Sequence, residues 1–540
     1  MKKKKLLFFM VKLVKKVNFI TVLWILFYFL VFGFLLKNSF SYLDPDLGWH
    51  LKVGEAIAQT GMVPHLNIYN YTFTGRWVDH EWLINLASFE IYSKLGYEAL
   101  NIIFALVILV SLILLNLFVR KTFPKTPIGI LMFLQIFGLI ASAPSFGIRM
   151  QEFGFLFLLL ELWIIKNFND KKSWRSLIWL LPLFYLWSNI HGSFLFGLGI
   201  LLFWLVIKLV ERGLLTTQFK EYFSNREAVR KSELKVFSIF SLGSVALTFL
   251  TPYGLELYSF LNGYANTFYL KSIQEWLSQF TPPFLYWQLA YLILFVVVMA
   301  PYFYNVFYKK VESINLWQLG LAVLFLILAF KSRRNFPLMF LATLPFIIKN
   351  IYNFLGIDAG TKFKIRKELK YFLLICLSLA AIGQYISLRP ISNPFSSYCT
   401  KFPCQATEFL KTETKYKDLT LFNDYNWGGY LIWVYPEKKI FIDGRLPQVA
   451  YGGHTFLEEY YEFFKPNADY ESKLAQYNIK LVLTKTNDDK IQLKNWEKFI
   501  FQFKDSDLVF PNRLRNYLDT ANNWQKIYSD SLATIYLKIN

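Results

Sequence analysis

The stretch NFITVLWILFYFLVFGFLL, residues 18–36, contains no charged residue and is about as long as a helix must be to cross a bilayer. It is soon followed by YLDPDLGWHLKVGEAI, residues 42–57, which carries Asp44, Asp46 and His50. Ionisable groups this close to hydrocarbon are costly, so they mark either a functional site or a solvated helix end. The first stretch predicts a membrane anchor. For the second stretch, the rest of the chain has to decide between a functional site and a solvated helix end.

Similar apolar stretches recur along most of the chain. The sequence is 55% hydrophobic and only 18% charged, which is too apolar for an ordinary soluble protein. We therefore expect a mainly α-helical, polytopic transmembrane domain over residues 1–390, with about eleven spans. The expected spans are residues 18–36, 97–119, 126–143, 152–165, 176–190, 193–207, 236–252, 286–308, 314–330, 335–348 and 371–388. The first is too long for a cleaved signal peptide, so we expect it to remain as an anchor.

The net charge of +21 distinguishes the two sides of the membrane. If the Lys-rich segment 1–17 is cytoplasmic and the spans alternate, the cytoplasmic segments hold 29 basic and 8 acidic residues, which is the whole net charge. The positive-inside rule predicts this distribution. We therefore expect a multi-pass protein with a cytoplasmic N-terminus. Nucleic acid is not an expected partner, because the positive charge is explained by orientation in the lipid bilayer.

The composition changes in the last part of the chain. Residues 391–540 predict a small extracytoplasmic α/β domain, with strands in LTLFND, KIFIDG, IKLVLTK and LATIYLKI and helices in GGHTFLEEYYEFFK and YESKLAQY. The NWGG motif between them predicts a turn. Asp424, Asp443 and Arg445 follow strands, where ligands often bind, but a buried Asp443–Arg445 bond is the stronger interpretation. Cys399 and Cys404 form either a short disulfide or two separate thiols.

The unusual polar motifs all fall on the expected external side. The first external loop, residues 38–96, contains DPDLGWH, GRWVDHEWL and an amphipathic helical pattern between them. Trp49, Trp77 and Trp82 in this loop fit an aromatic belt at the membrane surface. Further polar residues lie at the external ends of later spans, in SFGIRMQEF, SNIHGS, IQEWLS and KSRRN. We expect a cavity at this boundary, lined from several helix ends.

These motifs resemble those of the GT-C superfamily of membrane glycosyltransferases, in particular the bacterial branch related to protein mannosyltransferases and lipid A aminoarabinose transferases. The resemblance lies in Asp44 and Asp46, the following LKVGEAIAQTGMVPHLNIYNYTFTG, and WVDHEWL. WSNIHGSFLFG, TPYGLELY, IQEW, SRRNFPL and FNDYNWGGYLIW look like a bacterial family of predicted glycosyltransferases. The resemblance implies an enzyme of a bacterial plasma membrane that transfers sugar from a polyprenyl-phosphate donor to an extracytoplasmic glycan, lipid or protein acceptor.

Such a transfer needs a base for the acceptor, a cation for the departing phosphate and polar groups for the sugar. Asp44 is the expected catalytic base and Asp46 its alternate, a turn or a helix cap being the other interpretation. Arg333 and Arg334 suit a lipid phosphate, because guanidinium groups bind phosphate through two hydrogen bonds, although arginines also snorkel to ordinary headgroups. The other expected substrate-binding residues are His50, Asp79, His80, Glu81, Arg149, Gln151, Asn189, His191 and Glu275.

The cofactor and the class of protein have alternatives. A divalent metal is left open, with Asp46 and His80 as candidate ligands, but HEWLI lacks the second histidine of a zincin motif. A multi-span transporter or lipid flippase is the main rival, since it would also have many spans. Transporters usually show repeats and polar groups near the bilayer centre, whereas these clusters gather at one boundary. A non-catalytic envelope scaffold is the third reading, and it would not need Asp44.

Overall fold

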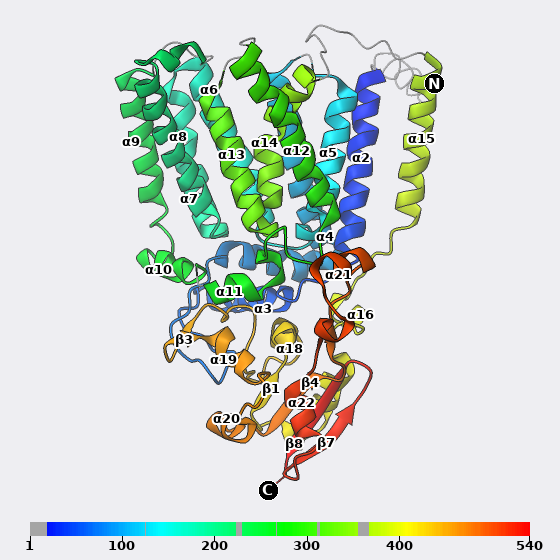
Figure 1. Ribbon diagram of the computed structural model, residues 1–540. Coiled ribbons are helices and arrows are strands. Elements are labelled where there is room, and N and C mark those ends of the chain that lie inside the picture. The colour runs from blue at the N-terminus through cyan, green and yellow to red at the C-terminus, as the bar shows by residue number, and fades with distance from the viewer. Residues whose placement is uncertain are drawn as a thin grey trace, which may run out of the picture.

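The computed structural model describes residues 19–124, 126–222, 229–265, 267–309, 314–354 and 367–539. The Lys-rich segment 1–17, on which the predicted orientation depends, lies outside the described residues. The chain is mainly helical: long helices stand side by side in a bundle, and a smaller part with a β-sheet lies beyond one end of it (Figure 1). Residues 391–539, called the tail below, form most of that smaller part.

Each expected span coincides with a helix of the bundle. These helices are α2 (Phe19–Ser39), α4 (Trp82–Thr122), α5 (Ile128–Ser142), α6 (Glu152–Lys171), α7 (Leu180–Ile190), α8 (Phe194–Leu214), α9 (Lys231–Leu247), α12 (Tyr286–Tyr304), α13 (Leu316–Lys331), α14 (Phe336–Phe354) and α15 (Lys367–Ile386). Among the described residues, five helices are long and apolar enough to cross a membrane, and two further apolar helices are shorter. The total of about eleven crossings therefore stays a prediction.

Glycine and proline lie near the end of one of these helices and at a break inside another. α9 ends at Leu247 rather than at residue 252, in a region where Pro252 and the positive φ of 52° at Gly254 favour turns. α4 contains a break at Gly96, whose φ of 81° and ψ of 178° are open mainly to glycine. The break separates the part of α4 in the first external loop from the part that forms the expected span 97–119.

Shorter elements lie at the end of the bundle and in the tail. The helices are α3 (Leu47–Thr60), α10 (Leu255–Gly263), α11 (Thr267–Ser272), α16 (Pro394–Ser397), α17 (Cys404–Thr412), α18 (Gly428–Val434), α19 (Phe456–Glu462), α20 (Tyr470–Gln476), α21 (Asn495–Phe501) and α22 (Arg513–Leu518). α3 confirms the predicted amphipathic helix of the first loop. α19 and α20 confirm the two helices predicted in the tail.

The tail contains one four-stranded sheet with the order β1-β4-β8-β7. Its strands are β1 (Leu421–Asn423), β4 (Leu481–Lys485), β7 (Trp524–Ser529) and β8 (Ala533–Lys538), and only the pair β1 and β4 is parallel. Two short ribbons complete it, β2 (Ala450–Tyr451) with β3 (His454–Thr455) and β5 (Asp489–Lys490) with β6 (Val509–Phe510). β7 was not predicted. NWGG is not the expected simple turn, because its glycines begin α18.

The predicted strand KIFIDG forms only single bridges, from Ile440 to Leu421 and to Asn70. The second bridge comes from the first external loop: the N–H of Ile440 donates to the carbonyl of Tyr69 at 3.1 Å. Thr72 Oγ1 also donates to the carbonyl of Phe441 at 2.6 Å. The backbone of this segment is therefore shared between the tail sheet and the first loop, which a local strand pattern does not show.

The tail also packs closely on α3, through glycines on both sides. A Cβ atom on Gly48 would lie 2.1 Å from the carbonyl oxygen of Gly429, and one on Gly429 would lie 2.3 Å from that of Pro45. Any side chain at either position would force the two backbones apart. Trp49 and Trp77 are only 4% and 3% exposed in the shared core, so the aromatic-belt interpretation of these two residues is wrong.

A buried arginine joins the same two parts of the chain. Arg445 Nε and Nη2 donate to the two carboxylate oxygens of Asp443, each at 2.8 Å, and Nη2 also donates to Asn70 Oδ1 at 3.0 Å. The guanidinium lies 4.8 Å from the ring centres of Tyr69 and Trp77. These contacts confirm the interpretation of Asp443 and Arg445 as a buried structural bond, and they extend it into the first loop.

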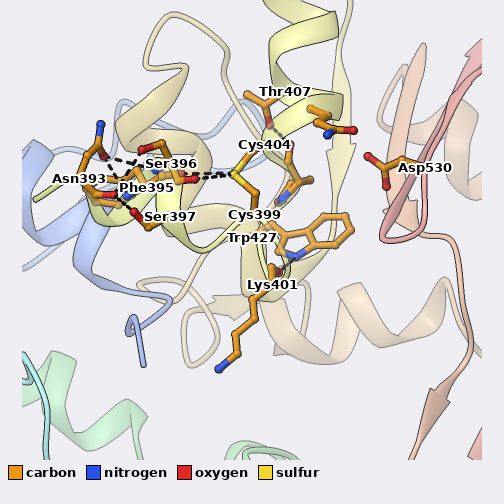
Figure 2. The surroundings of a disulfide bond; sticks show 12 residues. Asn393, Phe395, Ser396, Ser397, Cys399, Lys401, Cys404, Thr407, Trp427 and Asp530 are labelled. Carbon is orange, nitrogen blue, oxygen red and sulfur yellow. Dashed lines mark hydrogen bonds between the residues drawn. A yellow bond between two sulfur atoms is a disulfide. The ribbon is translucent and has the colours of Figure 1, made fainter. Parts of the chain in front are cut away.

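Cys399 and Cys404 form a disulfide, so the first of the two predicted alternatives is correct (Figure 2). The loop that it closes carries Lys401, whose carbonyl accepts a hydrogen bond from Trp427 Nε1 at 3.2 Å. Lys401 Nζ also lies 5.0 Å from the ring of Tyr42, two residues before Asp44. The disulfide loop thus touches both the start of α18 and the chain that leads to Asp44.

Candidate functional site

Four charged side chains from separate segments form a continuous series of ion pairs at the end of the bundle nearest the tail. Arg149 Nε donates to Asp44 Oδ2 at 2.8 Å, and Arg149 Nη2 donates to Glu275 Oε2 at 2.8 Å. The other oxygen of Glu275 accepts from Arg334, whose guanidinium lies 5.0 Å from the ring of Trp276. We call Asp44, Arg149, Glu275 and Arg334 the ion-pair chain. The structure thus brings together four of the predicted residues.

The segments that carry the ion-pair chain are short and tightly turned. Asp44 follows α2, Arg149 precedes α6, Glu275 lies in a 3-10 turn (Gln274–Trp276), and Arg334 lies in another (Arg333–Asn335). Ser332 Oγ donates to the carbonyl of Glu275 at 3.2 Å, which ties these two turns together. The ion-pair chain is therefore built from the ends of helices and the turns between them.

Glu275 and Arg149 stabilise each other's charged forms. Burial alone would raise the pKa of Glu275, but Arg149 and Arg334 outweigh it and lower the pKa to about 2. Burial opposes the charge of Arg149, yet Glu275 and Asp44 raise its pKa overall. Because the folded pKa of Glu275 lies below its ordinary value of 4.5, these pairs stabilise the fold above that pH. This stabilisation is lost as the pH falls from 4.5 toward 2.

Asp46 lies beside the ion-pair chain but is not a member of it. It precedes α3 but makes no capping bond with its side chain, whereas Asp44 Oδ1 accepts from the N–H of Asp46 at 2.9 Å. Among the described residues, Asp46 forms no ion pair. Burial, and then the charge of Asp44, raise its pKa to about 7. A carboxyl group with this pKa can both accept and release a proton near neutral pH.

The tail forms one wall of the Asp46 environment. A Cβ atom on Gly444 would lie only 2.0 Å from Asp46 Oδ1, so the carboxylate rests directly on the glycine between Asp443 and Arg445. Asp46 also contributes to the raised pKa of Tyr425, after burial and Tyr269. The first loop and the tail therefore meet at this carboxylate.

A second cluster surrounds Glu81. Glu81 Oε1 lies 3.2 Å from His191 Nε2 and 3.8 Å from His80 Nε2, and Oε2 lies 3.8 Å from His50 Nδ1. Burial raises the pKa of Glu81 well above its usual value, and burial lowers the pKa of His50 and of His80 to about 3. Burial therefore disfavours the charged form of Glu81 and of both histidines.

Asp79 is held by one amide. Asn85 Nδ2 donates to both oxygens of Asp79 at 2.9 Å, and Asn85 Oδ1 lies 2.7 Å from His50 Nδ1. The N–H of Glu81 also donates to Asp79 Oδ1 at 3.1 Å, so Asp79 shapes the turn that precedes α4. Burial raises the pKa of Asp79 to about 6. Asp79 and His50 thus belong to the Glu81 cluster through Asn85.

The residues present do not fit a bound metal. In the part of the chain that the structure describes, no three His, Cys, Asp or Glu side chains lie together as metal ligands would. His191 Nδ1 accepts a hydrogen bond from the N–H of Ser193 at 2.9 Å, so its Nε2 carries the proton toward Glu81 and offers no lone pair. The candidate ligands Asp46 and His80 lie in different groups, the first beside the ion-pair chain and the second in the Glu81 cluster, so they do not form one ligand set.

Three predicted site residues instead hold the backbone. Gln151 Nε2 donates to the carbonyl of Ser145 at 3.3 Å, and Asn189 Nδ2 donates to the carbonyl of Tyr185 at 2.8 Å. Arg333 donates to the carbonyls of Thr281 and of Pro283. Of the two arginines expected to bind phosphate, Arg334 belongs to the ion-pair chain and Arg333 binds backbone carbonyls, and their role toward a phosphate stays a prediction. Adjacent residues of a 3-10 turn point in different directions, which explains the separation.

Three residues of the site were not predicted: Asn85, Gly444 and Tyr425. Asn85 is a fully buried amide in an otherwise apolar part of α4, and that placement is the signal that could have identified it. Gly444 lies between two residues that were singled out for their charge. Tyr425 could not be recognised, because its neighbour Asp46 is distant in the sequence.

A cleft of about 1340 Å³ lies in the tail and reaches Tyr425. Aromatic, acidic, amide and basic side chains of the tail line it together with Phe268 of α11; they include Tyr425, Tyr460, Tyr461, Asp424, Asn426 and Lys485. Asp424 Oδ2 lies 3.7 Å from Lys485 Nζ at this cleft. Since Tyr425 contributes to both regions, the cleft adjoins the environment of Asp46.

No protein-family model and no curated protein matches the sequence. Among solved structures, the chain is similar to the oligosaccharyltransferase of Archaeoglobus fulgidus tethered with an acceptor peptide containing the NVT sequon, with a TM-score of 0.51 and 13% identity over 87% of this chain and 69% of that one. The same archaeal protein, AglB, in complex with an inhibitory peptide and a dolichol-phosphate gives a TM-score of 0.50 and 12% identity over 87% and 70%. The chain therefore shares the GT-C fold of these structures.

Proposed function

We propose that the protein is an integral membrane glycosyltransferase that moves a sugar from a polyprenyl-phosphate donor to an extracytoplasmic acceptor. The ion-pair chain beside Asp46 is the observation that carries this proposal, because Asp46, whose pKa is raised to about 7, is hydrogen-bonded to Asp44, from which the ion pairs continue through Arg149 and Glu275 to Arg334. The shared fold supports it, since the archaeal neighbour has been solved with an acceptor peptide and with a dolichol-phosphate. A glycan, lipid or protein remains the proposed acceptor class.

In this proposal Asp46 is the base and Asp44 is a positioning residue. Asp44 was the expected base, but its carboxylate is committed to Arg149, whereas Asp46 forms no ion pair among the described residues. Asp46 takes the proton from the acceptor hydroxyl or amine as the acceptor atom bonds to the anomeric carbon. The bond from that carbon to the phosphate oxygen breaks, and the phosphate leaves with the electron pair.

Arg149 and Arg334 stabilise the leaving phosphate in this mechanism. A guanidinium has five N–H donors, and Arg334 uses one of them on Glu275. The remaining donors suit phosphate oxygens, where charge accumulates as the bond breaks. Glu275 keeps the two guanidiniums close to each other and holds them in place before the donor binds.

The cleft in the tail is the proposed entry for the acceptor. Aromatic rings and carboxylates are the groups that stack on and hydrogen-bond to saccharides, and peptides use the same contacts. Asp424 at the cleft is then an acceptor contact, in line with its position after β1. The Glu81 cluster and Asp79 supply the polar groups that hold the donor sugar.

The proposed location is a bacterial plasma membrane, with the bacterial mannosyltransferase and aminoarabinose transferase branch as the proposed relatives. Residues 1–390 form the transmembrane domain with about eleven spans, and residues 391–540 form the extracytoplasmic α/β domain. The disulfide supports an oxidising compartment for the tail. The charge distribution supports a cytoplasmic N-terminus.

The test is a transfer assay with purified protein, labelled polyprenyl-phosphate sugars and a panel of candidate acceptors. We expect Arg334→Gln to raise the KM for the donor by about 10- to 100-fold, because it removes a charged hydrogen bond to phosphate. Arg76→Gln is the matched control, since Arg76 lies in the first loop but its side chain is 69% exposed. Solute transport across sealed vesicles without any sugar transfer would contradict the proposal and favour a transporter.

Gly444→Ala is expected to lower kcat roughly 100-fold, because a misplacement of about 1 Å in a catalytic group has this effect. The added methyl group would lie 2.0 Å from Asp46 Oδ1 and would displace the carboxylate. Gly383→Ala is the matched control, since a Cβ atom there meets nothing within 4 Å. Transfer assays with both variants check the prediction, and an unchanged kcat for Gly444→Ala would remove Asp46 from the mechanism.

A further inference from the structure

Residues 489–510 of the tail form an apolar segment that lies at the end of the helical bundle. This segment begins at β5, contains α21 and ends at β6. Its exposed large apolar side chains are Ile491, Trp496, Phe499, Ile500, Phe501, Phe503 and Phe510. Phe499 is 84% exposed and Ile500 is 60% exposed. A cluster of this size marks an interaction surface rather than ordinary surface scatter.

Contacts with the start of α12 fix the position of α21 along the helical bundle. The N–H of Phe284 donates to Glu497 Oε1 at 3.1 Å, and the rings of Phe284 and Trp496 stack with centres 5.8 Å apart. Lys494 Nζ lies 3.7 Å from the ring centre of Tyr286, the first residue of α12. α21 therefore lies where a helix suited to crossing a membrane begins, and Figure 1 shows it directly at the bundle end, away from the tail sheet.

The faces of α21 have different character. Trp496, Phe499 and Ile500 follow the spacing of one helical face, while Glu497 is buried against the bundle. Residues 489–510 carry four lysines and four acidic residues, and Lys498 pairs with Asp505 at 2.6 Å, so two of the lysines, Lys494 and Lys498, lie beside or within α21 without giving the segment a net charge. Exposed Trp and Phe with flanking Lys are the composition of interfacial membrane helices.

We propose that the exposed side chains Trp496, Phe499 and Ile500, called the α21 patch, insert into the phospholipid surface on the tail side of the membrane that the bundle crosses. Phosphate headgroups then contact the flanking lysines, and the aromatic and aliphatic groups reach the upper acyl chains. Two observations select lipid as the occupant. The patch is continuous with the start of α12 through the stacking of Trp496 on Phe284, and its exposed Trp and Phe rings are the side chains that enter a lipid–water interface. This inference does not depend on sugar transfer.

The test uses the full chain in nanodiscs made of phosphatidylethanolamine and phosphatidylglycerol, with Cys376→Ser to remove the free thiol. Phe499→Cys and Ile500→Cys carry a nitroxide label in separate samples, and Ala475→Cys is the control. Ala475 is an exposed residue of α20, which lies far from the bundle in Figure 1. All three positions are exposed, so the substitutions leave the packing intact.

The measurement is the collision rate of each label with oxygen and with a water-soluble nickel chelate. We expect the ratio of oxygen to chelate accessibility at 499 and 500 to exceed that at 475 several-fold, since oxygen concentrates among acyl chains. A label at 499 that is as accessible to the chelate as the label at 475 would overturn the proposal. Protection of 499 from both reagents would also overturn it, because a second copy or another protein would then cover the patch.

Discussion

Asp46→Asn is expected to lower the rate of sugar transfer about 1000-fold, within the range that general base catalysis contributes. The amide keeps the shape of the side chain but cannot accept the proton of the acceptor. The wild-type enzyme should also show a pH dependence set by this group. Because the base acts only when deprotonated and its pKa is about 7, kcat/KM should fall about tenfold per unit as the pH drops below 7.

Measurement of kcat/KM against pH for both proteins checks this prediction. Asp505→Asn is the matched control, because the Asp505 side chain is 87% exposed, pairs with Lys498 at the surface and lies outside the cleft. If Asp46→Asn retains the acidic limb of the profile, another group is the base. Asp44→Asn would then be the variant that removes the limb, and the roles of the two carboxylates would be reversed.

Arg445→Met is expected to destabilise the fold by about 3–5 kcal/mol, because it leaves the buried carboxylate of Asp443 without its partner. The loss should first free the tail from the first loop, since Arg445 also binds Asn70. Thermal unfolding in detergent and limited proteolysis of the tail measure the two effects. Arg230→Met is the control, with a side chain that is 79% exposed.

The double variant Asp443→Leu with Arg445→Met separates charge from shape. Replacing both charges with apolar groups removes the unpaired carboxylate, so much of the lost stability should return. A double variant that is no more stable than Arg445→Met would show that the contacts with Asn70, Tyr69 and Trp77 carry the stability instead of the ion pair.

The helices of the bundle could be predicted because each depends on one local property, a run of apolar residues of sufficient length. α3 was predictable for a similar reason, since its apolar residues recur at helical spacing. The prediction of a full strand in KIFIDG was wrong because its backbone partners include Asn70 and Tyr69, which lie hundreds of residues away. The aromatic-belt prediction for Trp49 and Trp77 was wrong for the same reason, since the core that buries them comes partly from the tail.

The membership of the ion-pair chain was predictable, but its pairing was not. Asp44, Arg149, Glu275 and Arg334 stand out in sequence as charges beside apolar segments. Which of Arg333 and Arg334 faces Glu275 depends on the geometry of a single turn. Asp46 differs from Asp44 because it is covered by Gly444 of the tail, and no local sequence pattern around either aspartate indicates this contact.

The glycine contacts between the first loop and the tail also set the order in which the site is completed. Asp46 is synthesised early, whereas Gly429 and Gly444 emerge from the ribosome only after every bundle helix. A nascent chain can thus occupy the bilayer with all four members of the ion-pair chain and still lack the wall on which Asp46 rests. The surroundings of Asp46 are therefore complete only after the last segment of the chain has been synthesised and has packed onto the first loop.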